Sequence, residues 1–118
     1  MNGPFYCWGA GINGNSPEAF VATWRYVHDL FAQEGALNVL WVWSPNYDGD
    51  GAYPIAPYFP GDNYVDWVGL DGFAWFGVYH NSSYTFERMI ETSYATVTSL
   101  TKKPIRSEER RVGKECRL

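Results

Sequence analysis

The sequence of 118 residues contains few basic residues and only two cysteines. Nine lysines and arginines stand against 13 aspartates and glutamates, a net charge of −4, which argues against the basic surface that nucleic-acid binding needs. Cys7 and Cys116 provide neither a disulfide framework nor the ligand spacing of a metal site. The pattern leaves one disulfide between them open, and we expect Cys7 to pack inside the protein. We predict no metal, no cofactor and no nucleic-acid partner.

Long hydrophobic runs are also absent. No stretch approaches the roughly 18 apolar residues that a membrane-spanning helix requires. The first residues lack the basic and then apolar pattern of a secretion signal. We therefore predict no membrane partner, and the cellular location has to be inferred from the function.

Aromatic residues, in contrast, are abundant. Six Trp, nine Tyr and seven Phe all precede residue 105. Rings beside acidic groups are typical of sugar-binding proteins, because rings stack on the C–H faces of sugars while carboxylates and amides bind the hydroxyls. A core rich in aromatic side chains explains the same composition equally well, so both interpretations stay open.

A first helix is indicated by Ser16-Pro17-Glu18, which combines a capping hydroxyl, a proline suited to the first turn and an acid near the positive end of the helix dipole. Apolar residues then follow at helical spacing from Phe20 to Phe31, and we expect the helix to end near Gly35. His28 lies on or beside this apolar face, where a packed or rim histidine is the expected role.

Two apolar runs, NVLWVWSPN (38–46) and YVDWVGLDGF (64–73), predict strands covered on both faces, as in parallel sheets. Segment 47–63 between them has no helical period, and its aromatic residues favour a functional loop. A second helix is predicted from Thr85 to about Thr101, and Ile105 begins a further strand. This order of elements is typical of the middle of an α/β protein.

The last 13 residues, 106–118, differ in composition from the rest, with five basic and three acidic side chains. The segment RSEERRVGKEC (106–116) resembles the in-frame translation of a sequencing-adapter oligonucleotide. We therefore predict a protein domain over residues 1–105 and a tail without biological role over residues 106–118.

Four motifs, in this order and spacing, resemble glycoside hydrolase family 26, which includes endo-β-1,4-mannanases: MNGPFYCWG (1–9), NVLWVWSPN (38–46), YFPGDNYVDWVGLDGF (58–73) and KKPI (102–105). The resemblance covers about residues 1–105. It implies a (β/α)8 barrel, of which the chain would span the end of the fourth strand to the start of the seventh. Catalytic groups in such barrels lie where strands end and loops begin.

The resemblance places both catalytic glutamates outside the chain. In the family motif His-Glu-Met-Asn-Gly the acid/base glutamate would precede Met1, and the nucleophile would follow Ile105. Glu108 and Glu109 lie near the expected distance, but in a charged run without an apolar strand, so we interpret them as solvated. Because retaining hydrolysis needs both carboxylates, we expect a fragment that is inactive alone. The parent protein is expected to be secreted or held at the cell surface, because its substrates are polymers.

The expected substrate-binding residues follow from the same resemblance. Asn2 would orient the acid/base glutamate or a sugar hydroxyl, and Asp71 would contact a hydroxyl or support the site. Three tryptophans are expected to stack on sugars or to line the cleft, with barrel packing as an equal alternative: Trp8, Trp43 and Trp75. Packing or structural roles are expected for Trp24, Trp41, Asp62 and Asp66. His80, in an aromatic loop, is expected to be a surface histidine, with the lining of a subsite as the alternative, and Phe73 stands where the family often has tyrosine.

Two other interpretations remain open at this stage. A non-catalytic carbohydrate-binding module would explain the aromatic and acidic composition, but such modules are mostly β-sandwiches, whereas this sequence predicts two helices. A fragment with open sheet edges would also tend to aggregate.

Overall fold

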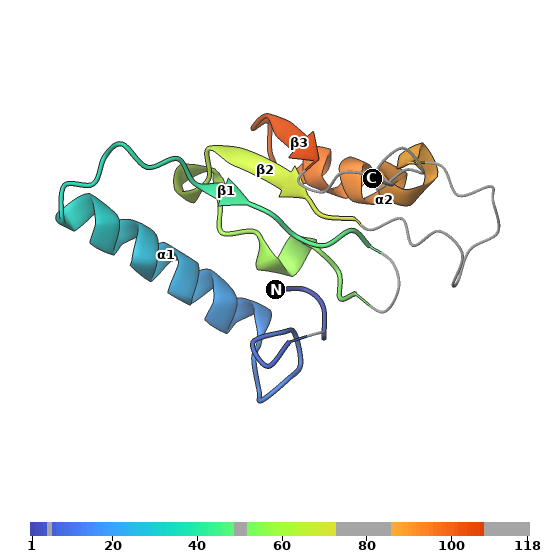
Figure 1. Ribbon diagram of the computed structural model, residues 1–118, viewed down its shortest axis with the longest axis horizontal. Coiled ribbons are helices and arrows are strands. Elements are labelled where there is room, and N and C mark those ends of the chain that lie inside the picture. The colour runs from blue at the N-terminus through green and yellow to red at the C-terminus, as the bar shows by residue number, and fades with distance from the viewer. Residues whose placement is uncertain (5, 49–51, 73–85, 108–118) are drawn as a thin grey trace, which may run out of the picture.

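The structure, a computed structural model, describes residues 1–4, 6–48, 52–72 and 86–107 (Figure 1). One α-helix precedes the first strand of a parallel sheet and another lies between the second and third strands, while two short 3-10 helices precede the second strand. Neither α-helix in this described part is long and apolar enough to cross a membrane. The predicted order of helices and strands is confirmed. In chain order the elements are α1 Pro17–Gln33, β1 Val42–Trp43, η1 Ala56–Tyr58, η2 Asp62–Tyr64, β2 Trp67–Leu70, α2 Phe86–Leu100 and β3 Ile105–Ser107.

Helix α1 begins and ends where its sequence signals predict. Ser16 is the N-cap residue, and its hydroxyl accepts a hydrogen bond from the Ala19 N–H (3.2 Å). Pro17 opens the first turn. The helix ends at Gln33, and Gly35 adopts the left-handed conformation, with φ of 75°, that closes many helices.

Strand β2 is the central strand of the sheet, between β1 and β3. The parallel register pairs Trp43 with Val68 and Val68 with Ile105. The prediction that Ile105 starts a strand is therefore confirmed. Because the three strands run in the same direction, their carboxyl ends meet at one edge of the sheet (Figure 1).

The strands are shorter than the apolar runs that predict them. Within residues 38–46 the ladder covers only β1, and Asn46 forms one further bridge with Asp71. Pro45 lies between β1 and this bridge, and proline has no N–H to donate to a ladder. The second run begins as the 3-10 helix η2, which follows Gly61 with φ of 103°, so β2 starts only at Trp67.

One face of the sheet is covered much better than the other. Side chains alternate between faces along a strand, so Trp43, Val68 and Leu70 share one face. All three are buried, in one core cluster with Val97 of α2. On the opposite face Trp67 is 39% exposed. The prediction that both faces are covered is therefore wrong at this position.

The segment between β1 and β2 contributes to the core. Ile55 and Tyr58 are buried members of the core cluster. The 3-10 helix η1 holds Tyr58 edge-on to Phe20 of α1, with 5.8 Å between ring centroids. In its described part, this predicted functional loop therefore also packs α1 onto the sheet.

An aromatic cluster packs α1 against Trp41, just before β1, and against Tyr64, at the end of η2. The Trp24 indole N–H donates to the Tyr64 carbonyl oxygen (2.9 Å), and its ring meets Trp41 edge-on at 5.7 Å. His28 lies beside the rings of Trp41 and Tyr64, at centroid distances of 5.2 and 4.9 Å. Its Nδ1 is 3.1 Å from a carboxylate oxygen of Asp29. The packing roles predicted for Trp24, Trp41 and His28 are confirmed.

Two aspartates hold the amino-terminal side of β2. Asp66 accepts a hydrogen bond from the Trp41 N–H (2.8 Å). Asp62 begins η2, and its carboxylate accepts a hydrogen bond from the Thr101 hydroxyl beyond the end of α2. The structural role predicted for Asp66 is confirmed, and Asp62 joins a turn to the end of a helix.

Cys7 is an exposed, free residue, so the prediction that it packs inside the protein is wrong. The Gly9 N–H donates to the Tyr6 carbonyl oxygen (2.8 Å), which closes a surface turn around Cys7. Cys116 lies outside the described residues.

Candidate functional site

Polar side chains gather at the carboxyl edge of the sheet, where β1 and β2 end. Ser44 follows β1, Asp71 follows β2, and the Ser44 hydroxyl donates to Asp71 Oδ1 (3.0 Å). The backbone also holds Asp71, because its N–H donates to the Pro45 carbonyl (3.0 Å) and its carbonyl accepts the Tyr47 N–H (2.8 Å). Asp71 therefore occupies the strand end expected from the sequence. Sequence reasoning misses Ser44, although a hydroxyl directly after a strand was an available signal.

Asn2 lies at the same edge and is fully buried. Its Nδ2 donates to the carbonyl oxygens of Asn46 (2.9 Å) and Tyr53 (3.0 Å), and its Oδ1 accepts the Asn46 N–H (2.9 Å). The backbone carbonyl of Asn2 accepts the Tyr53 N–H (2.6 Å). Both side-chain N–H donors are thus used by the backbone of another segment. Asn2 has no donor left for the sugar hydroxyl that the sequence interpretation gives it.

The amino group of Met1 lies near the Asp71 carboxylate. Burial lowers the pKa of this amino group, and the negative charge of Asp71 raises it by a smaller amount. The Met1 carbonyl accepts the Ala10 N–H (2.9 Å), which fixes the first residue against the loop that follows. Residue 1 is therefore placed beside the ends of β1 and β2.

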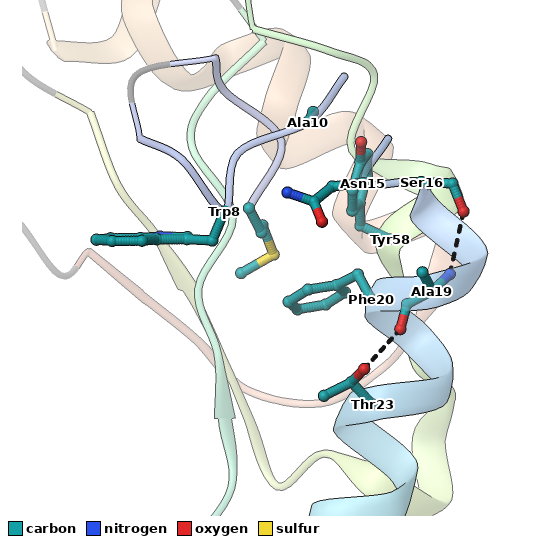
Figure 2. A pocket seen from close by; sticks show the side chains of 9 residues that line it. Trp8, Ala10, Asn15, Ser16, Ala19, Phe20, Thr23 and Tyr58 are labelled. Carbon is teal, nitrogen blue, oxygen red and sulfur yellow. Dashed lines mark hydrogen bonds between the residues drawn. The ribbon is translucent and has the colours of Figure 1, made fainter. Parts of the chain in front are cut away.

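Trp8 keeps an exposed ring. Its side chain is 64% exposed and stacks on Tyr6, with 4.7 Å between centroids and 3° between ring planes. Figure 2 shows Trp8 across from Phe20 and the first turns of α1, at a pocket of about 250 Å³. Met1 and Tyr58 also line this pocket, whose walls are mostly apolar. An exposed, stacked ring has the property that a sugar-stacking platform needs.

Trp43 is placed differently. It is fully buried, and its ring packs against Phe59 at 5.1 Å. The register puts it on the same face as Val68, which is the face that the core covers. Among the described residues, its indole N–H has no hydrogen-bond acceptor. The ring offers no open face to a ligand in this structure, and packing, the alternative weighed from the sequence, accounts for its position.

A second polar group links the segment after β1 to α2. The Asp48 N–H donates to the hydroxyl of the buried Ser93 (2.7 Å). Burial raises the pKa of Asp48, whereas hydrogen bonds from the Ile55 N–H and the Thr96 side chain lower it by less. The sequence gives no signal for this contact, because Asp48 and Ser93 are 45 positions apart. Among the described residues, no three His, Cys, Asp or Glu side chains group closely enough to hold a metal ion.

Several residues singled out from the sequence lie outside the described residues. They include Trp75, the fifth expected substrate-binding residue, and Phe73, which stands where the family often has tyrosine. The others are His80, Glu108 and Glu109.

Comparisons with known proteins identify the family of the chain. The sequence profile of glycosyl hydrolase family 26 matches residues 1–108. The chain belongs to glycosyl hydrolase family 26. Endoglucanase H of Acetivibrio thermocellus is 34% identical over an alignment of 113 residues, which covers 91% of this chain and 12% of that protein. Mannan endo-1,4-beta-mannosidase A and B of Caldalkalibacillus mannanilyticus is 38% identical over 78 residues, or 62% of this chain and 15% of that protein.

A solved structure of the family gives the same result for the fold. The structure of GH26A from a Muricauda species superposes with a TM-score of 0.67 and 26% identity, over 94% of this chain and 34% of that one. The chain thus spans about a third of that structure and a smaller share of the two relatives. Its small parallel α/β sheet is consistent with part of the family 26 barrel.

Proposed function

We propose that the chain is part of a retaining glycoside hydrolase that acts on β-mannan or a related plant polysaccharide. Family 26 membership supports a glycosidase, and the two relatives are named as an endoglucanase and a mannan endo-1,4-beta-mannosidase. A polysaccharide is accordingly the proposed partner. Because polymers are too large to enter cells, the parent protein is proposed to be secreted or held at the cell surface.

The observation that carries this proposal is the convergence of both chain segments on one edge of the sheet. Met1 lies beside Asp71, and β3 ends level with β2, because Ser107 pairs with Leu70. A glutamate before Met1 and a glutamate shortly after β3 would therefore both lie near Asp71. Retaining hydrolysis requires two carboxyl groups about 5 Å apart, and the approach of both chain segments to one edge supports this proposal.

The proposal has a definite extent along the barrel. Residues 1–105 would run from the end of the fourth strand to the start of the seventh, and residues 106–118 would be adapter-derived. Arg106 and Ser107 continue β3 in the structure, which does not conflict with this origin, because a parallel ladder pairs backbone groups. On this proposal the chain lacks both catalytic glutamates and is inactive alone.

Among the expected sugar contacts, the geometry favours Trp8 and Asp71. Trp8 has an exposed ring, and Asp71 is half-buried at the carboxyl edge of the sheet. Trp75 keeps its proposed stacking role on the resemblance alone. Asn2 and Trp43 would act through packing and hydrogen bonding behind the site.

A carbohydrate-binding module does not match the described fold. Such modules are mostly β-sandwiches, whereas the described part of this chain has parallel strands and two α-helices.

Activity assays test the proposal at two levels. The 118-residue chain is expected to show no turnover of β-mannan or mixed-linkage β-glucan, and turnover at a rate ordinary for such enzymes would refute the claim of inactivity. A reading frame extended with the native flanking sequence is expected to hydrolyse one of these polymers with retention of the anomeric configuration, which NMR of the first product reveals. A matched variant with Gln for the glutamate before Met1 should be inactive. Inversion, or full activity of that variant, would refute the proposed mechanism.

A further inference from the structure

We propose that Asn2 is a positioning residue, which fixes the segment after β1 against the start of the chain and so sets the geometry of the carboxyl edge. The inference gives Asn2 a different task from the contact with the acid/base glutamate or a sugar hydroxyl that the sequence leads us to expect. It rests on the proposed function for the meaning of this edge, but the contacts that carry it are independent of any substrate.

Every hydrogen-bonding group of the Asn2 side chain, except one lone pair of its oxygen, has a backbone partner. Both N–H groups and the oxygen bind backbone atoms of Asn46 and Tyr53, at distances between 2.9 and 3.0 Å. These partners are 44 and 51 positions away in the sequence. The side chain is fully buried, so in the folded protein these bonds do not compete with bulk water.

Asn2 is connected to Asp71 through Asn46. Asn46, whose N–H and carbonyl both bind Asn2, forms the bridge that continues the ladder between β1 and β2. Its partner in that bridge is Asp71. The side-chain amide of Asn2 therefore holds Asn46 after the end of β1. Through the bridge of Asn46, it is also connected to the backbone of Asp71 at the end of β2.

Only an amide side chain supplies both the donors and the acceptor that this position requires. Two carbonyl oxygens require donors, and one N–H requires an acceptor. A carboxylate of the same shape presents one oxygen to both carbonyls and offers them no donor, whereas an alanine leaves all three groups unpaired. Asparagine provides two donors and an acceptor at fixed positions.

Amide hydrogen exchange of the 118-residue chain tests the inference, because three reporter amides respond differently. The Asn46 N–H binds the Asn2 side chain directly, so Asn2→Ala removes its acceptor. The Tyr53 N–H binds the Asn2 backbone carbonyl and the Tyr47 N–H binds the Asp71 carbonyl, and both acceptors remain in the variant. A positioning role predicts that Tyr47 and Tyr53 also lose protection, by about tenfold, the factor of one typical buried hydrogen bond.

Core amides and a matched variant serve as controls. The Val68 N–H, bonded to the Pro104 carbonyl, should keep its protection in Asn2→Ala. Asn15→Ala removes another asparagine whose Nδ2 binds backbone carbonyls, those of Cys7 and Gly9, within the same N-terminal segment. This control should leave Tyr47 and Tyr53 unchanged.

Asn2→Asp provides a second variant if Asn2→Ala does not fold. Burial against two carbonyl oxygens should raise the pKa of the new carboxyl, and its protonated form can donate one hydrogen bond. Protection of Tyr53 in Asn2→Asp, relative to the wild type at each pH, should therefore be low at pH 7 and partly recover at acid pH. The wild-type reference accounts for the other titratable groups described near this edge, the Met1 amino group, Asp48 and Asp71.

The exchange measurements distinguish a positioning role of Asn2 from a purely local or a global loss of stability. The inference would be overturned if Asn2→Ala lowered the protection of Asn46 alone, or lowered that of Val68 as much as that of Tyr47 and Tyr53. It would also be overturned if Asn15→Ala lowered the protection of Tyr47 and Tyr53 equally, or if protection of Tyr53 in Asn2→Asp did not depend on pH. Loss at Tyr47 and Tyr53 with a preserved core supports it. Since no sugar enters this measurement, failure of the activity assays would refute the proposed function and leave the exchange result standing.

Discussion

The hydrogen bond between Ser44 and Asp71 can be measured as a coupling energy. Ser44→Ala removes the hydroxyl that donates to Asp71 Oδ1 over 3.0 Å, and Asp71→Ala removes the acceptor. Hydrogen bonds to charged groups contribute about 1.5–3 kcal/mol when buried. Both side chains here are half-buried, so solvent screens the interaction, and we expect a coupling of about 1 kcal/mol.

Urea unfolding followed by tryptophan fluorescence gives the free energy of unfolding of the wild type, both single variants and the double variant. The open sheet edges favour aggregation, so the titrations require low protein concentration and a check that the chain is monomeric. The loss in the double variant should be about 1 kcal/mol smaller than the sum of the two single losses, because the pair is lost only once. Tm should fall by roughly 3–6 °C in Ser44→Ala.

Thr98→Ala provides the control for this cycle. The Thr98 hydroxyl donates to the Tyr94 carbonyl within α2 (2.9 Å) and has no described contact with Asp71. Its effect should add to that of Asp71→Ala within about 0.3–0.5 kcal/mol. If Ser44→Ala and Asp71→Ala are equally additive, the hydrogen bond contributes nothing and the assignment of Ser44 to the site is wrong.

Two further variants test the core and the pH dependence. Trp43→Phe should change the free energy of unfolding by less than about 1 kcal/mol, because the smaller ring removes a buried N–H without a described acceptor as well as packing. Trp43→Ala should lower the free energy of unfolding by about 3–5 kcal/mol. An equal loss in both variants would contradict this account. Burial raises the pKa of Asp48, so the stability that this carboxyl contributes is complete below its unfolded pKa and is lost as the pH rises through the folded value. Asp48→Asn stays neutral and should gain stability relative to the wild type over that rise; a gain on acidification instead would reverse the sign of the effect.

The elements that sequence predicts well are those with local causes. The start of α1 depends on Ser16 and Pro17, and its end on Gly35, all within one turn of the helix bounds. The position of Asp71 follows from the end of one apolar run. Each of these signals acts between residues at most a few positions apart, so a single sequence contains it.

The features that sequence misses depend on contacts between distant segments. Asn2 meets Asn46 across 44 positions, and Ser44 meets Asp71 across 27. Neither partner is visible until the register between β1 and β2 is known. Cys7 shows the opposite case, because an apolar residue between two aromatic ones suggests burial, and a local turn places it on the surface.

The motif WVWSPN shows how one residue of register decides which side chain reaches the site. Trp43 pairs with Val68, so it shares a face with Val68 and Leu70 and enters the core. Asp71 follows Leu70 directly and therefore belongs to the other face, as does Ser44, which follows Trp43. Trp43 and Asp71 cannot both point toward one cleft. The tryptophan attracts attention in the sequence, but the alternation of the strand brings the serine beside it to the carboxylate.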